Sequence, residues 1–95
     1  MSYKVLVDDN FHYMDTDARY TLGEFDTSEA AIAACKEIVD EFLRQSYKPS
    51  MTAEELYNSY VGFGEDPFIE HGAHFSAWTY AKERCSQIAQ RARRE

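Results

Sequence analysis

Hydrophobic and polar residues alternate along the first 25 residues, and this period of two is typical of β-strands. Tyr3, Val5 and Val7 alternate with Lys4, Leu6 and Asp8. The polar residues at 8–10 and 15–17 are typical of turns, because Asp and Asn tolerate left-handed backbone angles. We therefore expect three strands, at 3–7, 11–14 and 19–25, joined as an antiparallel meander. The alternative is one long hairpin with a bulge at residues 8–9.

Farther along the chain the spacing of apolar residues changes to three and four, which is typical of amphipathic helices. This spacing predicts a helix over residues 27–45 and another over residues 77–92. Thr52 and Glu55 form a capping-box pattern that predicts a short helix over residues 53–60. Gly62 and Gly64 are expected to end that short helix.

Residues 61–75 contain three of the four glycines and Pro67. A long loop without secondary structure is uncommon in a small domain. The segment is therefore either a short edge strand near residues 68–69 or a functional loop. Taken together, the patterns predict one α+β domain over residues 1–95. It has a small antiparallel sheet of three strands, or four with the short edge strand, two long helices on one sheet face and a short helix between them.

Composition limits the class of protein. Hydrophobic residues make up 44% of the chain and aromatic residues 15%, which is too rich for a disordered chain. No apolar run is long enough to span a membrane, and the first residues lack the pattern of a secretory signal. We therefore expect a cytoplasmic protein with no membrane partner.

Charge is unevenly distributed around the net value of −7. Residues 1–81 contain 5 basic and 15 acidic side chains, whereas residues 82–95 contain 5 basic and 2 acidic ones. An acidic body repels phosphate groups, so binding to nucleic acid is not expected. The same acidity permits a different hypothesis, that the protein mimics nucleic acid and occupies a nucleic-acid-binding protein.

Catalytic signatures are absent from the sequence, so we lean against an enzyme and expect no cofactor. Cys35 and Cys85 each fall on the apolar face of a predicted helix, where burial makes a thiol unreactive. No Gly-x-Ser-x-Gly nucleophile pattern occurs. Residues 62–64 (GFG) are followed directly by two acidic residues, which would repel a bound phosphate.

Glu70, His71 and His74 place two imidazoles and a carboxylate close together in sequence. A zinc site would need further donors from elsewhere in the chain, because zinc in proteins usually has about four ligands. This group, together with Asp66, supports a small-ligand or metal site within residues 62–75 as an alternative function.

Seven of the fourteen aromatic residues fall within residues 57–80. Tyr and Trp are enriched at protein interfaces, but a chain of this size also needs aromatic rings in its core. Trp78 lies one position away from the apolar stripe of the last predicted helix, and so on its flank. The main hypothesis is a non-enzymatic interaction module, binding an unknown protein or forming a homodimer, that uses residues 57–80. The candidate binding residues are Phe63, Asp66, Phe68, Glu70, His71, His74 and Trp78.

Three stretches of the chain are similar to a family of small bacterial proteins of unknown function. They are residues 7–15 (VDDNFHYMD), 63–69 (FGEDPFI) and 75–78 (FSAW). The resemblance implies a free-standing bacterial, cytoplasmic domain. It implies no activity, substrate or catalytic residue.

Overall fold

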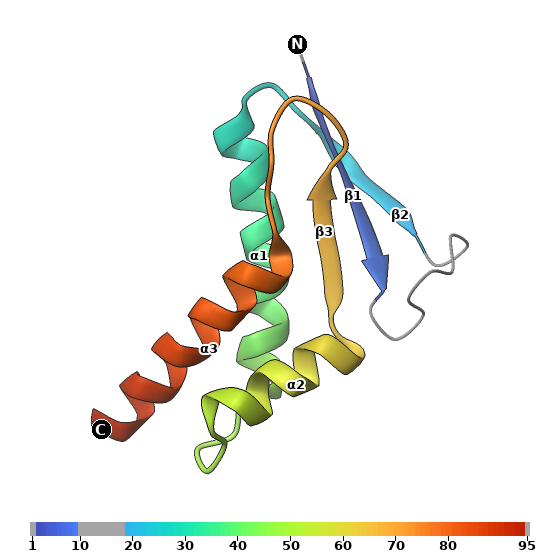
Figure 1. Cartoon of the computed structure of the whole chain (residues 1–95). Helices are drawn as coiled ribbons and strands as arrows, with labels where there is room; N and C mark the ends of the chain where they lie inside the picture. The colour runs from blue at the N-terminus through green and yellow to red at the C-terminus, as the bar shows by residue number, and fades with distance from the viewer. Residues whose placement is uncertain (1, 10–18, 95) are drawn as a thin grey trace.

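The computed structural model describes residues 2–9 and 19–94, with side chains up to residue 90. Figure 1 shows the described elements in chain order. They are β1 (Tyr3–Asp9), β2 (Tyr20–Phe25), α1 (Ser28–Ser46), α2 (Ala53–Phe63), β3 (Glu65–Ile69) and α3 (Ala77–Arg94). The strand that the sequence predicts at 11–14 lies outside the described residues.

The sheet has the antiparallel order β2-β1-β3, with β1 in the centre. The predicted meander is therefore wrong, because β1 pairs directly with β2, from Tyr3 opposite Phe25 to Val7 opposite Tyr20. This pairing is the hairpin alternative. Its register shift, however, lies between Val5 and Leu6 rather than at residues 8–9. Val5 and Val7 are both fully buried, which places β1 in the middle of the sheet.

The glycine-rich segment contributes an edge strand, as one of the two readings of the sequence predicts. β3 pairs with β1, from Val5 opposite Ile69 to Asp9 opposite Glu65. The backbone N–H of Glu70 donates to the carbonyl of Lys4, so alternate residues of β3 face β1 and the nitrogen of Pro67 faces outward. Proline is compatible with this position because an edge strand does not need that N–H for pairing.

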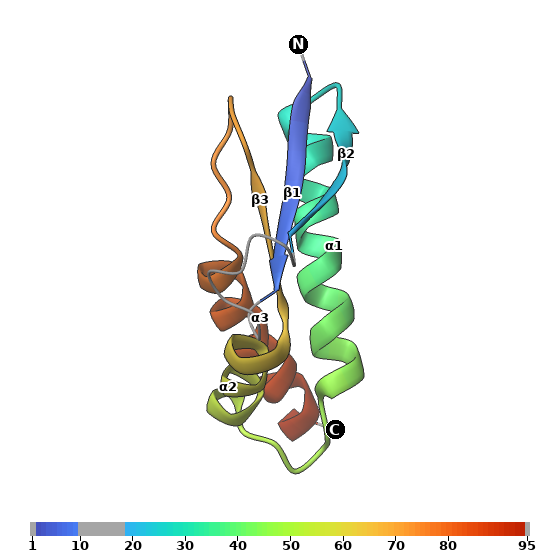
Figure 2. The ribbon, with the colours of Figure 1, turned by 90° about the vertical axis from the view of Figure 1, so that its right-hand side faces the viewer.

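The helices are close to their predicted ranges, but their arrangement is different. α1 lies along one face of the sheet, as the two views in Figures 1 and 2 show. α3 packs mainly on α1 and α2 and reaches the sheet at β3. Only one of the two long helices therefore covers the sheet. α2 also continues to Phe63, with Gly62 inside its last turn and Gly64 as its C-cap.

Two clusters of buried side chains hold these elements together. The first joins the sheet to the N-terminal half of α1 through Val5, Ala31, Cys35 and Ile69. The second joins the three helices, and its buried members are Val39, Leu43, Leu56, Tyr60, Ala77, Ala81 and Cys85. The small residues on α3 allow its backbone to approach its neighbours closely, which explains the stripe of alanines in the sequence. No helix in the described part of the chain is both long enough and apolar enough to cross a membrane.

Candidate functional site

The face of the sheet opposite α1 carries side chains of a mixed kind. Val5 and Ile69 pack with α1, so the residues that alternate with them point to the other face. These residues are Leu6 and Asp8 on β1 and Asp66 and Phe68 on β3. Apart from the β3 edge, which the start of α3 reaches, no helix of the described chain lies over this face of the sheet in Figure 1. We call these four residues, with Arg19, the open face.

Arg19 links the two strands on the open face. Its guanidinium donates to both carboxylate oxygens of Asp8, with Nε at 2.5 Å and Nη2 at 3.1 Å. The same group lies 5.2 Å from the centre of the Phe68 ring. The pair with Asp8 raises the pKa of Arg19. The Arg19 guanidinium therefore covers one face of the Phe68 ring and pairs with the Asp8 carboxylate, and both interactions lie near the surface.

Asp66 lies directly opposite Asp8 in the pairing of β1 with β3. Burial raises the pKa of Asp66, and the charge of Asp8 acts in the same direction. A hydrogen bond from the side chain of Trp78 lowers the pKa and opposes these two effects. The indole of Trp78 thus ties the start of α3 to β3 through a carboxylate that is costly to ionise.

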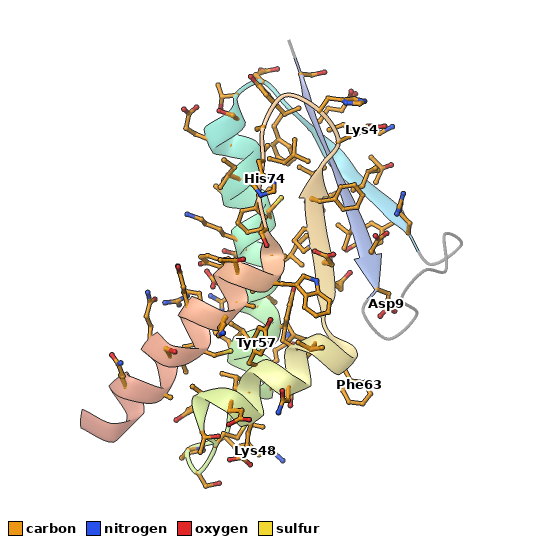
Figure 3. The ribbon with its side chains drawn as sticks, in the orientation of Figure 1. Lys4, Asp9, Lys48, Tyr57, Phe63 and His74 are labelled. Carbon is orange, nitrogen blue, oxygen red and sulfur yellow. The ribbon has the colours of Figure 1, made fainter. Side chains whose placement is uncertain are left out.

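Trp78 also packs edge-on against Tyr60, with ring centroids 6.4 Å apart and an interplanar angle of 80°. Tyr60 is fully buried, and its hydroxyl donates to the carbonyl of Glu65 at 2.6 Å. Trp78 therefore packs against the core through Tyr60 and contacts the edge of the open face through Asp66. Phe63, one turn beyond Tyr60, has 67% of its surface exposed and points outward from the end of α2 in Figure 3.

Most aromatic residues of the 57–80 segment belong to the core rather than to a surface. Phe75, Trp78 and Tyr80 are partly buried against the helical core cluster. The ring of Phe75 lies 5.7 Å from that of Tyr80. Of the seven predicted binding residues, the structure brings Asp66, Phe68 and Trp78 to β3, beside the end of α2 that carries Phe63.

His71 and His74 lie beyond the end of β3, away from that group, whereas Glu70 directly follows β3, where its backbone N–H donates to the carbonyl of Lys4. Figure 3 shows His74 beside the N-terminal half of α1 and Phe63 well away from it, at the end of α2. Glu70 lies 3.9 Å from Lys4 and 4.0 Å from His71, and the His71 side chain is 89% exposed. Within residues 2–9 and 19–94, no three metal-ligating side chains come together. His71 and His74 are exposed side chains of the loop that follows β3.

The two thiols are buried in separate clusters and are not joined to each other. Burial raises the pKa of both Cys35 and Cys85 to about 11. A thiol with so high a pKa is almost fully protonated at neutral pH and is a poor nucleophile. This environment does not support cysteine catalysis.

Two of the hollows on the described surface could hold a ligand or a side chain. One, of about 430 Å³, lies between α2 and α3 and is lined by Ala53, Glu54, Tyr57, Asn58, Lys82 and Ser86. The other, of about 270 Å³, lies between α1 and the start of β3. Neither is lined by His71 or His74.

Sequence reasoning missed Arg19 and Leu6 as parts of the candidate surface. The signal for Leu6 is its alternation with Val5 and Val7, which places it on the face opposite the core. Arg19 has no comparable signal, because its contact with Phe68 depends on the order of the strands.

No family model matches the chain, and neither a curated protein nor a solved structure shows significant similarity to it. The resemblance to a bacterial family stays a prediction.

Proposed function

We propose that this protein is a non-enzymatic interaction module that binds another protein through the open face and the adjoining Phe63. The observation that carries the proposal is the exposed Phe63 next to a sheet face that holds the half-buried Leu6 and Phe68. No described helix covers this face beyond its β3 edge. A charged rim around a few large apolar side chains is typical of protein interfaces.

The described part of the chain gives less support to catalysis. The cysteines are buried with raised pKa values, and His71 and His74 are exposed, with no group of three metal-ligating side chains among the described residues. Asp66 has a raised pKa, but its neighbours are Trp78 and Asp8 rather than a nucleophile. A binding role uses these residues without requiring a reactive group.

The proposal is tested by photo-crosslinking in the native cells. A photoreactive phenylalanine analogue replaces Phe63, and in a matched control it replaces Ala33, which is exposed on α1. We expect one discrete covalent adduct from position 63 that is absent from position 33. Adding Arg19→Glu should abolish that adduct, because it changes the charge of the open face without touching the core. An adduct that forms equally from both positions, or that survives Arg19→Glu, contradicts the proposal.

A second candidate, small-ligand binding, is supported by the hollow between α2 and α3. Its volume of about 430 Å³ lies within the roughly 300–1,000 Å³ of typical ligand sites. Glu54 and Lys82 bring both signs of charge to it, and Tyr57 offers an aromatic surface, a set suited to a zwitterion such as a free amino acid. Chemical shifts of Tyr57 during titration with free amino acids test this candidate. Shifts that persist in Lys82→Ala would count against it.

A further inference from the structure

The hollow between α1 and β3 has an acidic rim and an apolar floor. Its lining residues are Glu37, Ile38, Glu41, Phe42, Gln45 and Glu65. Ile38 and Phe42 are half-buried, whereas the side chains of Glu37 and Glu41 are 69% and 53% exposed. We call this hollow the acidic groove. It lies on the other side of the sheet from the open face.

Among the described side chains, one cation of the same chain touches the rim. Arg44 pairs with Glu37 at 3.2 Å and also with Glu41, and its hydrogen bond and charge lower the pKa of Glu41. Glu65 is instead held by the hydroxyl of Tyr20 at 2.7 Å, a neutral donor. Three carboxylates against one guanidinium leave the groove with a net negative charge, so it favours a cationic occupant.

The size of the groove points to side chains rather than to a small molecule. Its volume of about 270 Å³ is below the roughly 300 Å³ at which ligand sites begin. Lys and Arg side chains have an apolar stem and a charged head. Ile38 and Phe42 offer a surface for such a stem, and the glutamates around them offer partners for the head.

The chain itself contains one segment of matching charge. Residues 82–95 carry 5 basic and 2 acidic side chains, against 5 and 15 in the rest of the chain. Among the side chains that the structure describes, Ala89 is the last core residue of α3, and the helix continues to Arg94. Figure 1 shows this end of α3 projecting on the side of α1 opposite to β3, so it is directed away from the groove of its own chain.

We propose that a second copy of this chain fills the acidic groove with the basic C-terminal end of its α3. The contact is head-to-tail, because the surface that one copy offers differs from the surface that the other supplies. It is independent of the open face, so this inference stands or falls separately from the proposed function. Its attraction is between exposed charges, and it must weaken as salt screens them.

Sedimentation velocity of the full chain gives the first test. We expect association at about 10 mM salt, where the screening length is about 30 Å, and a loss of at least about tenfold in the association constant at about 1 M salt, where it is about 3 Å. A monomer at low salt, or an association that salt does not change, overturns the proposal.

An exchange of charges gives the decisive test. Glu37→Lys with Glu41→Lys reverses the groove, and Arg91→Glu with Arg93→Glu and Arg94→Glu reverses the helix end. We expect each variant alone to be monomeric and an equimolar mixture of the two to associate. In the mixture the reversed end of one variant meets the reversed groove of the other, and the unchanged end meets the unchanged groove. A mixture that stays monomeric, or a variant that self-associates like the wild type, contradicts the contact.

Two controls separate this contact from other effects of charge and from the open face. Glu24→Lys with Glu29→Lys makes the same change in net charge away from the groove and should leave self-association unchanged. Replacing Phe63 should also leave it unchanged. If replacing Phe63 abolishes self-association, the copies meet at the open face instead and the groove assignment is wrong.

Discussion

Gly64 lies so close to Tyr60 that a methyl group at position 64 would stand 2.5 Å from Cδ1 of the Tyr60 ring and 2.8 Å from the Tyr60 carbonyl oxygen. Real Cβ atoms do not approach other heavy atoms so closely, and the Tyr60 ring is fixed in the core. The glycine allows α2 to end against its own last turn and β3 to begin one residue later.

Gly64→Ala should therefore destabilise the protein by about 1–3 kcal/mol, the usual cost of overpacking a tight site. Gly62→Ala is the matched control. Nothing lies within 4 Å of a Cβ at position 62, and the residue is inside the helix. This control should stabilise the protein by up to about 1 kcal/mol, through helix propensity. Urea unfolding of both variants measures the difference, and equal effects at the two glycines would refute the steric argument.

Tyr80 and Asp40 hold α3 to α1 through a second specific contact. The Tyr80 hydroxyl donates to both carboxylate oxygens of Asp40, at 2.9 and 3.0 Å, and Nε of Arg84 donates to one of them at 3.0 Å. Tyr80→Phe should lower the free energy of unfolding by about 1 kcal/mol, because it removes a partly buried hydrogen bond. Asp40→Asn, made alone and combined with Tyr80→Phe, completes a double-mutant cycle. A coupling free energy below about 0.5 kcal/mol would show that the contact is not energetically specific.

The helices were predictable because their signals are local. The capping box of Thr52 and Glu55 is confirmed, with both reciprocal hydrogen bonds at 3.1 Å. Ser76 accepts from the N–H of Thr79, as expected of an N-cap. These motifs involve residues three positions apart, so the sequence contains all the information that they need.

The sheet order and the candidate surface were not predictable in the same way. A period of two shows that residues 3–7 form a strand, but it does not say which segment pairs with it. Pairing β1 with a strand some sixty residues away depends on how α1 and α2 pack. Trp78 and Tyr60 illustrate the same limit, because residue type alone did not distinguish a buried ring from an interface ring.

The two thiols should be unreactive in the native protein. Cys35 and Cys85 are 0% and 1% exposed, and burial raises the pKa of each to about 11. At pH 8 we expect a thiol reagent to label them more than about tenfold more slowly than in the urea-unfolded chain. Ser86→Cys, which adds an exposed thiol next to Cys85, is the control and should react at once. Rapid labelling of both native thiols would show that the two core clusters open easily.

Raised pKa values of these thiols also predict a loss of stability in alkaline solution. The pKa of each thiol is raised from 9.0 to about 11, so between these values the folded state binds more protons than the unfolded state. The free energy of unfolding must then fall as the pH rises through this range. Replacing both cysteines with alanine should reduce that slope, and an unchanged slope would contradict the assignment. The slope is compared rather than the absolute stability, because the alanines also leave cavities.

Asp66 and Asp8 lie opposite each other on neighbouring strands, yet replacing each with asparagine should have opposite effects on stability at pH 7. The pKa of Asp66 is raised by burial, so its ionisation costs more in the folded state than in the unfolded state. This cost is present above the raised pKa and disappears in acid, where the carboxyl is protonated. Asp66→Asn should therefore increase stability at pH 7 while keeping an oxygen that accepts the Trp78 hydrogen bond. Because Asp66 is only half-buried and solvent screens its charge, the gain is a few tenths of a kcal/mol to about 1 kcal/mol.

Asp8→Asn is the matched control, because Asp8 pairs with Arg19 through two hydrogen bonds. It should lower stability at pH 7 by up to about 1 kcal/mol, the usual limit for an exposed ion pair. Chemical unfolding at pH 7 and near pH 3 measures both effects. Since protonation removes the charge that Asp66→Asn removes, the difference between that variant and the wild type should vanish near pH 3. A gain of equal size at both pH values would mean that the asparagine stabilises by packing, and that the Asp66 carboxylate carries no electrostatic cost.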